Sequence, residues 1–392
     1  MPTPFVIIGN AGNRRIDLFQ QALAGRGLPL AQLVTYRDLI AGRVTLPEVV
    51  TPGSILRIES PGKDSEVERD LLIAGANVPD DPAFARISGA EVQRLLLEKG
   101  RMLYPRQWYL GYCQVLAAIE RQRALCPPHT LMNHPADIAV MFDKRVCHRR
   151  MRAAQIAVPR SLGPVRSYDE LIATMGRERC PRVFVKLAHG SSASGVVALQ
   201  VSERQQLATT TVELVQAGGE LQLYNSRRLR TYRDTREIAR LIDGLCHHCV
   251  HVEQWLPKAG IDERTCDLRV VVIAGRIRHV VVRLSRGPMT NLHLLNARGS
   301  FEAVLARMGL EAWASACQTC LHAMACFPQS LYAGIDLLIS PGYQRHAVLE
   351  INAFGDLLPG VLLEGEDTYS AEIAACHQAG LTEQAERYRK ST

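Results

Sequence analysis

The sequence has no apolar run long enough to cross a membrane, and residues 1–4 lack the basic and apolar regions of a signal peptide. It contains no internal repeat and no low-complexity linker. Its hydrophobic fraction of 47% and charged fraction of 22% are those of an ordinary globular protein, which excludes fibrous and disordered classes. We therefore expect a cytoplasmic protein without a membrane partner, and 392 residues suggest two or three domains.

Patterns typical of nucleic-acid-binding proteins are also missing. The sequence has no RNP, zinc-finger or helix-turn-helix pattern, so we expect no nucleic-acid partner although the net charge is +7. Arginine clusters at 145–152 and 227–240 supply much of this charge. Such an excess can hold phosphates or an anionic substrate, and the stretch 224–240 can equally be a solvated basic face. The sequence leaves both interpretations open.

Eleven cysteines stand at irregular spacing, which favours reduced thiols over a disulfide framework. Two clusters, Cys246-His247-His248-Cys249 and residues 317–326, contain both cysteine and histidine and raise the alternative of a structural zinc site. The second cluster falls inside an expected apolar helix, where a Cys-x-x-Cys pair has poor geometry for tetrahedral ligation. We therefore interpret these cysteines as small core residues.

The first third of the chain predicts an α/β domain with a mainly parallel sheet. Apolar segments typical of buried strands occur at Phe5–Ile8, Leu33–Tyr36 and Ile55–Ile58, and amphipathic segments separate them. The glycines after the first segment do not complete a dinucleotide-binding fingerprint. A helix is expected over Gln107–Ala124, and the prolines that follow Cys126 place the end of the first domain at residue 126.

A glycine-bounded loop stands between two predicted strands in the middle of the chain. One helix is expected from Asn133 to Ala154, followed by strands at Val183–Leu187 and Val196–Leu199. The loop between the strands is Gly190-Ser191-Ser192-Ala193-Ser194-Gly195, and its backbone N–H groups can approach phosphate oxygens. It is not a Walker motif, because no Gly-Lys-Ser/Thr end opens into a helix. Glycine and serine are also what an ordinary turn requires, so the loop alone does not decide its role.

The second half of the chain predicts a less regular alternation of strands and helices. We expect an arginine-rich hairpin at Glu220–Tyr232. The other expected elements are a helix at Asp234–Cys249, strands at Val252–Leu256, Asp267–Ile273 and Arg276–Leu284, and helices at Phe301–Met308, Glu311–Phe327 and Ser370–Gln378.

Two apolar strands, at residues 334–338 and 348–352, predict a hairpin that carries three polar side chains. If its centre lies near Tyr343, Asp336 and Glu350 lie opposite each other, because each is seven residues from that centre. Alternation along the second strand places Asn352 on the same face as Glu350, and Leu349 on the opposite face.

Two facing carboxylates repel each other unless a positive charge lies between them. A divalent cation held by Asp336, Glu350 and the amide oxygen of Asn352 would remove this repulsion, and oxygen ligands of this kind suit magnesium. The alternative is an exposed edge hairpin with scattered acidic residues.

Four separated motifs occur in order: Phe142-Asp143-Lys144, the strand Val183–Lys186 with its loop, Glu253-Gln254-Trp255-Leu256, and the Asp336/Glu350/Asn352 hairpin. Asp267-x-Arg269 and Thr290-Asn291-Leu292 fall between the last two. In this order the chain resembles the ATP-grasp superfamily, and most closely its ribosomal-protein glutamate ligases, over about residues 133–360. The resemblance implies an α/β ATP-grasp fold behind a Rossmann-like N-terminal domain. Its expected domains are residues 1–126, 127–200 with the flap, and 201–392 with the adenine strand and the metal site.

The resemblance also implies roles for individual residues. The positions that match nucleotide-binding ones are Lys144, Lys186, Gly190, Ser191, Ser192, Ser194, Gly195, Glu253, Gln254, Trp255, Leu256 and Asp267. The two lysines would hold phosphates, the loop would close over them as a flap, and the strand from Glu253 would contact adenine. The positions around the transferred phosphate, implied to be catalytic, are Arg269, Arg283 and Asn291. Asp336, Glu350 and Asn352 would hold two Mg²⁺ ions, or Mn²⁺ in their place.

The activity implied is that of an ATP-dependent carboxylate–amine ligase. A substrate carboxylate would take the γ-phosphoryl group of ATP, and an amine would then displace phosphate from the acyl phosphate, giving an amide, ADP and phosphate. The implied partners are a carboxylate and an amine, which is an amino acid or a peptide. The alternative is a catalytically silent ATP-binding regulator or scaffold of the same fold. The loop 353–360 differs from the Ser-Pro-Gly turn of many relatives, so the resemblance does not identify the substrates.

Overall fold

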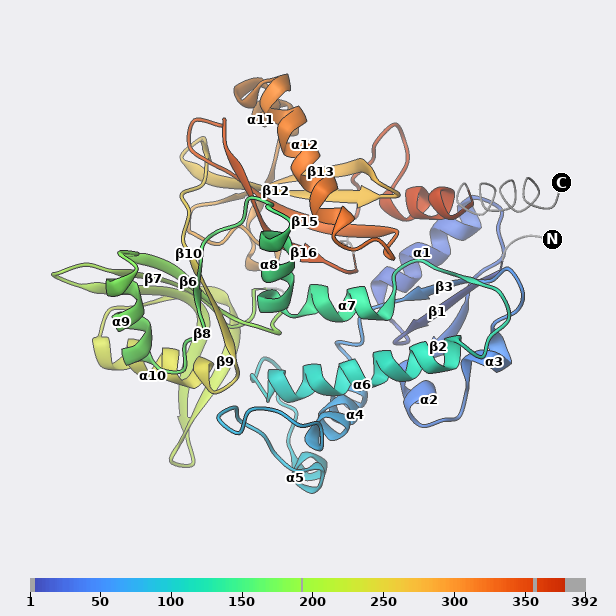
Figure 1. Ribbon diagram of the computed structural model, residues 1–392, viewed down its shortest axis with the longest axis horizontal. Coiled ribbons are helices and arrows are strands. Elements are labelled where there is room, and N and C mark those ends of the chain that lie inside the picture. The colour runs from blue at the N-terminus through green and yellow to red at the C-terminus, as the bar shows by residue number, and fades with distance from the viewer. Residues whose placement is uncertain (1–3, 192, 355–357, 378–392) are drawn as a thin grey trace.

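The first sheet consists of parallel strands. In the computed structural model, which describes residues 4–191, 193–354 and 358–377, its strand order is β2-β1-β3-β4 (Figure 1). The strands are β1 (Phe5–Gly9), β2 (Gln32–Thr35), β3 (Ile55–Ile58) and β4 (Thr130–Leu131). The predicted parallel α/β arrangement is confirmed, since β1 pairs in parallel with both β2 and β3. Because β4 pairs with β3, this sheet continues beyond the expected domain limit at residue 126.

Two helices of this region cross at a pair of glycines. The helices are α1 (Arg14–Gly25), α2 (Tyr36–Ile40), α3 (Leu46–Val49), α4 (Ser65–Ala76), α5 (Gly89–Arg94) and α6 (Pro105–Arg123). A Cβ atom at Gly75 would lie 2.0 Å from the Gln107 carbonyl oxygen, and one at Gly111 would lie 1.8 Å from the Leu71 carbonyl oxygen. The close crossing of α4 and α6 therefore depends on glycine at both positions.

The second sheet is antiparallel, with the order β5-β10-β6-β7-β8-β9. Its strands are β5 (Ser161–Gly163), β6 (Arg182–Leu187), β7 (Val196–Val201), β8 (Gln206–Ala217), β9 (Glu220–Tyr232) and β10 (Val250–Gln254). Helices α9 (Tyr168–Arg177) and α10 (Thr235–Cys246) cover one face, where Val185 packs with Leu171 and Leu241. Alternation along β6 turns Phe184 and Lys186 to the opposite face.

The stretch Glu220–Tyr232 is not the hairpin that the sequence predicted. It forms the single strand β9, and its hairpin partner is β8, a strand that the sequence did not predict. The turn lies at Gly218 and Gly219, whose φ angles of 60° and 83° favour glycine. Since β8, β9 and β10 all belong to the second sheet, this sheet also extends past the expected limit at residue 200.

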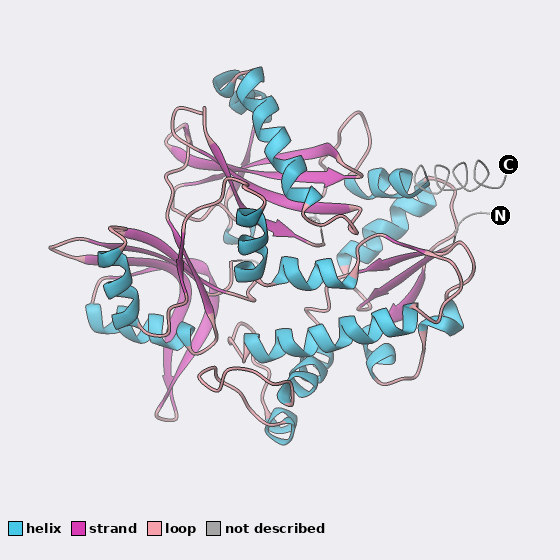
Figure 2. Cartoon of the chain, viewed as in Figure 1, coloured by secondary structure: helices cyan, strands magenta, loops and turns pink. Residues whose placement is uncertain are grey.

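The third sheet has the order β14-β13-β12-β15-β16 and carries the predicted hairpin. Its strands are β12 (Arg264–Ile273), β13 (Arg276–Ser285), β14 (Ala297–Gly299), β15 (Tyr332–Ile339) and β16 (His346–Asn352), and the short β11 (Gly260–Ile261) pairs with β12. Helices α11 (Phe301–Met308) and α12 (Leu310–Ala325) pack on one face, where Ala316 and Cys320 share a core with Ile335 and Leu337. Figure 2 shows the strands gathered into separate sheets with helices on their faces.

The expected helix from Asn133 to Ala154 is broken in two. Helix α7 (Pro135–Phe142) ends at Asp143, which has extended backbone angles and caps the start of α8 (Lys144–Ala153). The Asp143 carboxylate accepts hydrogen bonds from the backbone N–H groups of Arg145 and Val146. The break places Lys144 at the first position of α8.

A β-bulge interrupts the β15–β16 hairpin. Asp336 pairs with Glu350 as predicted, but Leu337 pairs with Val348, so Leu349 is one residue more than a regular ladder needs. The prediction that Leu349 faces away from Glu350 is therefore wrong, because both residues line the same cavity.

A sealed group of ions joins the first sheet to the helix at residues 368–377. Arg57 donates hydrogen bonds to Glu59 at 2.8 Å and to Glu372 at 2.5 Å. We call these three residues the Arg57 cluster. Rings of Phe19 and Tyr332 cover the guanidinium carbon at 4.5 and 5.0 Å, and the Arg57 side chain is fully buried.

Within the described part of the chain, no helix has the length and apolar character that a membrane span requires.

Candidate functional site

The hairpin carboxylates face cations supplied by other elements. Lys144 Nζ donates hydrogen bonds of 2.7 Å to Glu350 Oε1 and to the Gly190 carbonyl oxygen. Burial alone would raise the pKa of Glu350, but the ammonium groups of Lys144 and Lys186 outweigh it and hold this pKa below its ordinary value. Lys144 therefore connects α8, the flap loop and β16.

Asp336 lies between two arginines from neighbouring strands. Arg269 Nε is 2.7 Å from Asp336 Oδ1, and Arg283 Nη1 is 3.0 Å from the same oxygen. Arg269 also stands directly opposite Asp336 in the β12–β15 pair, so the sheet register fixes this contact. Burial keeps the pKa of Asp336 above its ordinary value, against the effect of both guanidinium groups.

Lys186 and Glu253 form an ion pair on the second sheet, where β6 pairs with β10. Glu253 is 2% exposed, and His251 Nε2 lies 3.3 Å from its second carboxylate oxygen. Burial raises the pKa of Glu253, but the Lys186 ammonium outweighs it and lowers this pKa to about 2.

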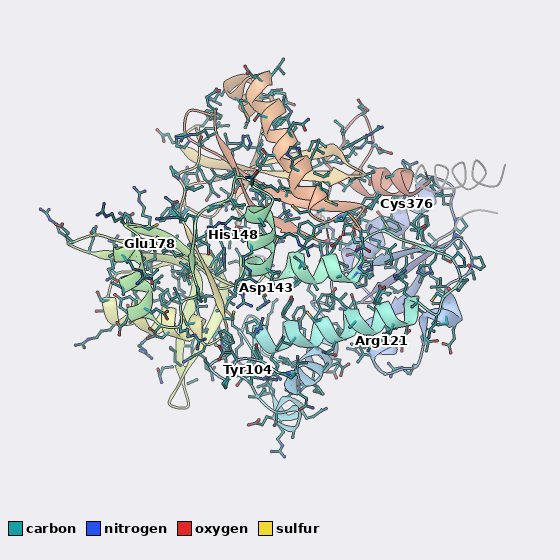
Figure 3. All side chains as sticks on the ribbon, viewed as in Figure 1. Tyr104, Arg121, Asp143, His148, Glu178 and Cys376 are labelled. Carbon is teal, nitrogen blue, oxygen red and sulfur yellow. The ribbon has the colours of Figure 1, made fainter. Side chains whose placement is uncertain are left out.

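A small cavity, which we call the central cavity, lies between the Lys144–Glu350 pair and the Lys186–Glu253 pair. Its lining includes Lys144, Lys186, Glu253, Glu350, Met151 and Leu349. Figure 3 labels two residues near it, with Asp143 at the start of α8 and His148 one turn further along the helix. The cavity thus brings together both predicted phosphate-binding lysines and one predicted metal ligand.

Asp267 belongs to an ion cluster that the sequence did not reveal. Its carboxylate accepts hydrogen bonds from Arg283 Nε at 2.7 Å, from Lys258 Nζ at 2.8 Å and from the Thr290 hydroxyl. These cations outweigh burial and hold the pKa of Asp267 well below its ordinary value. Lys258 escaped prediction because it stands in a loop after Pro257, where no spacing distinguishes it from a surface lysine.

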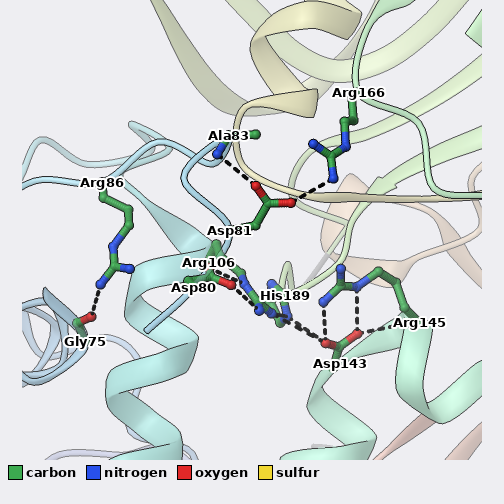
Figure 4. Close-up of polar contacts among 10 residues, drawn as sticks. All are labelled: Gly75, Asp80, Asp81, Ala83, Arg86, Arg106, Asp143, Arg145, Arg166 and His189. Carbon is green, nitrogen blue, oxygen red and sulfur yellow. Dashed lines mark hydrogen bonds and ion pairs between the residues drawn. The ribbon is translucent and has the colours of Figure 1, made fainter. Parts of the chain in front are cut away.

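The flap begins at a polar network that ties it to α8 (Figure 4). His189 Nε2 lies 3.0 Å from Asp143 Oδ2, and the backbone N–H of Lys144 donates to the Ala188 carbonyl at 3.0 Å. Burial lowers the pKa of His189 to about 4, so the ring is neutral at pH 7 and its Nε2–H donates to Asp143. The His189 ring also stacks on Tyr109, with 4.1 Å between ring centroids. None of these partners was predicted.

The flap itself has the shape of a tight turn. The Ser194 N–H donates to the Ser191 carbonyl at 2.9 Å, and Ser192 lies outside the described residues. Gly195 has a φ of 65°, and a Cβ atom there would lie 2.5 Å from Leu187 Cγ. Glycine is therefore required at this end of the flap, while Gly190 accepts the Lys144 hydrogen bond at the other.

An apolar patch lies on the same face of the second sheet as Lys186. Its buried members are Phe184, Val196, Ala198 and Met289. The Trp255 ring packs on Phe184 with 5.4 Å between centroids, while Gln254 and Leu256 are half-buried. Because β10 ends at Gln254, Trp255 and Leu256 lie beyond the strand that was predicted to include them. Met289 comes from the loop after β13, so the patch joins the second and third sheets.

The two predicted asparagines take different positions. Asn352 Nδ2 donates to the Gly334 carbonyl at 3.3 Å, and no described residue donates to its Oδ1. Asn291 begins the short 3₁₀ helix η1 (Leu292–Leu294), and its backbone carbonyl accepts a hydrogen bond from Asn296. Asn352 therefore has an oxygen to offer a ligand on the hairpin.

The hairpin carries oxygen donors of the kind that magnesium prefers. Asp336, Glu350 and Asn352 offer two carboxylates and an amide oxygen, which are hard ligands. The described residues contain no group of three or more Cys, His, Asp and Glu side chains that could hold a metal. Magnesium in proteins is commonly bound by one or two carboxylates together with substrate phosphates, and that pattern matches these residues.

All eleven cysteines are free thiols, including those of the two cysteine clusters. Cys246 and Cys320 are buried in the cores of the second and third sheets. Burial raises the pKa of Cys246 to about 12 and that of Cys249 to about 11, so both thiols are protonated at neutral pH.

The sequence matches no family model and no curated protein, but solved structures resemble the chain over nearly its whole length. The D-alanine–D-alanine ligase of Bacillus anthracis complexed with ATP has 12% identity and a TM-score of 0.53, covering 99% of each chain. D-cycloserine synthetase DcsG has 13% identity and a TM-score of 0.53, covering 96% of this chain and 99% of its own. Macrocyclase MdnC from Microcystis aeruginosa MRC, bound with precursor peptide MdnA, has 12% identity and a TM-score of 0.50, covering 94% of this chain and 97% of its own. At this level of identity the similarity shows the fold.

Proposed function

Because the chain has the ATP-grasp fold, we propose that it is an ATP-dependent carboxylate–amine ligase that releases ADP and phosphate. A substrate carboxylate takes the γ-phosphoryl group, and an amine then displaces phosphate from the acyl phosphate to form an amide. The finer resemblance to ribosomal-protein glutamate ligases stays a prediction.

The observation that supports this proposal most is the arrangement of charges around the central cavity. Lys144 and Lys186 approach it from α8 and β6, while Glu350 and Glu253 approach it from β16 and β10. Phosphoryl transfer depends on fixed positive groups more than on a protein nucleophile, because negative charge is spread over the transferred group. The cavity supplies such groups from helix α8 and from strand β6 of the second sheet.

In the proposed complex, Lys144 and Lys186 bind phosphate oxygens, and Asp336, Glu350 and Asn352 bind the magnesium ions. Magnesium supplies charge neutralisation and holds the phosphate oxygens in place. Each lysine must then exchange its present carboxylate partner for a phosphate oxygen. At Glu350 the exchange would conserve charge pairing, since this carboxylate would gain a metal partner as Lys144 leaves it.

Arg269 and Arg283 fit the role of orienting the group that is transferred. Both guanidinium groups are buried against Asp336 and are held by cross-strand pairing. A guanidinium fixed in this way loses little conformational freedom when it binds an anion. The apolar patch around Phe184 and Trp255 offers a surface for adenine next to Lys186.

The test of this proposal is product analysis. The purified chain is incubated with magnesium-ATP and pooled amino acids or candidate peptides, and the expected products are ADP and phosphate. Formation of AMP and pyrophosphate would refute the acyl-phosphate route. Nucleotide binding without turnover under every substrate pool would favour the catalytically silent alternative.

A further inference from the structure

The outer edge of β9 is only partly covered. β9 is the last strand of the second sheet, and its inner side pairs with β8. On its outer side, Met102 N–H donates to the Leu223 carbonyl at 2.9 Å, and Asn225 N–H donates to the Gly100 carbonyl at 2.7 Å. Beyond Asn225, no backbone hydrogen bond from a described residue reaches the outer edge. We call residues 226–232 the free edge.

A wide bulge pushes part of the free edge out of the ladder. Asn225 pairs with Val212 and Arg230 pairs with Thr210, so the four residues 226–229 stand against Thr211 alone. Arg227 and Arg228, at the centre of this bulge, are both exposed. The bulge therefore presents two guanidinium groups, and within it the Arg228 N–H donates to the Ser226 hydroxyl at 3.1 Å, while its backbone forms no pair with β8.

The positive charge of the free edge is not balanced within the described part of the chain. Arg230 forms an ion pair with Glu213, but no described carboxylate pairs with Arg227, Arg228 or Arg233. Arg286, in the loop after β13, is likewise exposed and has no ion pair with a described residue. A surplus of unpaired guanidinium groups along one edge favours an anionic ligand.

The free edge leads to the candidate site. Leu229 is 37% exposed, and a Cβ atom at Gly287 would come within 3.3 Å of its Cδ1 atom. Gly287 belongs to the loop that continues to Thr290, which donates a hydrogen bond to Asp267. The free edge therefore lies against the loop that carries Thr290 and against the 3₁₀ helix η1 in that loop.

We propose that the free edge binds an acidic peptide segment, which adds to β9 as an extended strand and leads its reactive end toward the central cavity. Strand addition pairs unused N–H and C=O groups of an edge with those of a partner, while side chains give specificity. A peptide fits better than a nucleic acid, because an edge offers donors and acceptors alternately whereas a phosphodiester chain offers only acceptors. The inference rests on the proposed ligase function in taking this peptide as a substrate.

Binding is measured without nucleotide, so that its outcome does not depend on catalysis. The probe is a fluorescein-labelled octapeptide of alternating glutamate and valine, followed by anisotropy, with a glutamine–valine octapeptide for comparison. We expect saturable binding of the acidic probe that weakens as salt is added. We also expect its binding to slow amide hydrogen exchange at residues 226–232, which attraction between charges alone would not do.

A matched pair of double variants separates the free edge from general charge. R227Q/R228Q removes two guanidinium groups from the bulge, and R236Q/R240Q removes two exposed ones from α10. We expect the first to weaken binding at least about tenfold and the second less than about twofold. Equal weakening by both variants, tighter binding of an oligonucleotide with the same charge, or unchanged hydrogen exchange would each overturn the proposal. If the acidic probe fails to bind while ADP release is observed, the docking inference is wrong and the ligase function stands. If the probe binds but no ADP is released, the docking inference stands and the ligase function is wrong.

Discussion

The central cavity and the Arg57 cluster both bury ions, but their charges are balanced in opposite ways. Together with the ion clusters of Asp267 and Asp336, the central cavity has the cations Lys144, Lys186, Lys258, Arg269 and Arg283 and the carboxylates Glu253, Asp267, Asp336 and Glu350. The Arg57 cluster has one cation between two carboxylates, Glu59 and Glu372. Among the described residues, the first group has one more cation than carboxylates, and the second has one more carboxylate than cations.

The two regions also differ in what covers them. Lys144 and Glu350 retain 12% and 26% of their side-chain exposure, whereas Arg57 and Glu59 retain none. In the sealed cluster, burial raises the pKa of Glu372 to about 7, so protonation of this carboxylate offsets the surplus of negative charge. A buried ion group with exchangeable partners therefore suits binding, while one sealed by aromatic rings suits attachment of one element to another.

The largest expected effect concerns Glu350. Glu350→Gln keeps the size of the side chain but removes the negative charge that pairs with Lys144 and that we propose binds magnesium. We expect ADP release to fall by at least about a thousandfold while the melting temperature changes by only a few degrees. The matched control is Glu203→Gln, an exposed residue far from the cavity lining. Near-normal turnover in Glu350→Gln would refute the metal assignment.

The opposite pattern is expected at Arg57. Arg57→Met leaves Glu59 and Glu372 buried without their cation, and loss of one partner from a buried ion group costs about 3–5 kcal/mol. Urea unfolding should therefore show a large loss of stability, while ADP release per folded molecule stays close to that of the parent. Arg121→Met, at an exposed position on α6, provides the control. If stability were unchanged, the Arg57 cluster would not be what attaches the helix at residues 368–377.

The pH dependence of stability separates the two regions further. The pKa of Glu372 is about 7 in the folded protein against 4.5 in the unfolded chain, so the folded state holds this proton more tightly. Stability from this group is present below about pH 4.5 and is lost as pH rises to about 7, by roughly 3 kcal/mol. Glu253, with a folded pKa of about 2, acts in the opposite direction and loses its contribution only as pH falls from about 4.5 to about 2.

Glu372→Gln tests this dependence directly. The amide keeps an acceptor for Arg57 but does not titrate, so urea unfolding between pH 5 and pH 7 should show a flatter profile than in the parent. A profile of unchanged slope would mean that another group carries the titration.

The smallest expected effect concerns His189. We do not expect this residue to contact ATP or magnesium, and it would act through Asp143 and the flap. His189→Ala removes the hydrogen bond to Asp143 and the contact with Tyr109. We expect the KM for ATP to rise about tenfold with a smaller change in kcat, because the flap and Lys144 lose their fixed relation. Tyr109→Phe keeps the stacked ring and should leave KM unchanged. A fall in kcat at constant KM would instead place His189 in the chemical step.

Local patterns in the sequence were sufficient for much of the fold. The strand at Ile55–Ile58 was predicted with the limits that β3 has, because three of its four residues are large and apolar, and all four are buried. The Asp336–Glu350 pairing was also predicted correctly, although the six-residue turn alone would have shifted it by one residue. The extra residue at Leu349 brings Glu350 opposite Asp336, and no feature of the sequence indicated this bulge.

Contacts between distant elements could not be predicted in this way. Lys258 and His189 have no neighbours in the sequence that mark them, and their partners Asp267 and Asp143 lie on other elements. Strand β8 was not predicted, although its threonines and valines favour a strand, and it pairs with β7 and β9. Side-chain roles that depend on such long-range contacts require the folded chain.

The extra residue at Leu349 limits how this hairpin can diverge among related chains. A regular two-residue alternation tolerates length changes in pairs, because an odd change sends every following side chain to the other face. The bulge absorbs one odd residue at the position where the carboxylate is needed, so Glu350 stays on the cavity side while Val348 and Ile351 both stay in the core. Over evolutionary time, the turn at 340–345 is then free to lengthen or shorten, whereas the single insertion beside Glu350 should persist with the carboxylate that it orients.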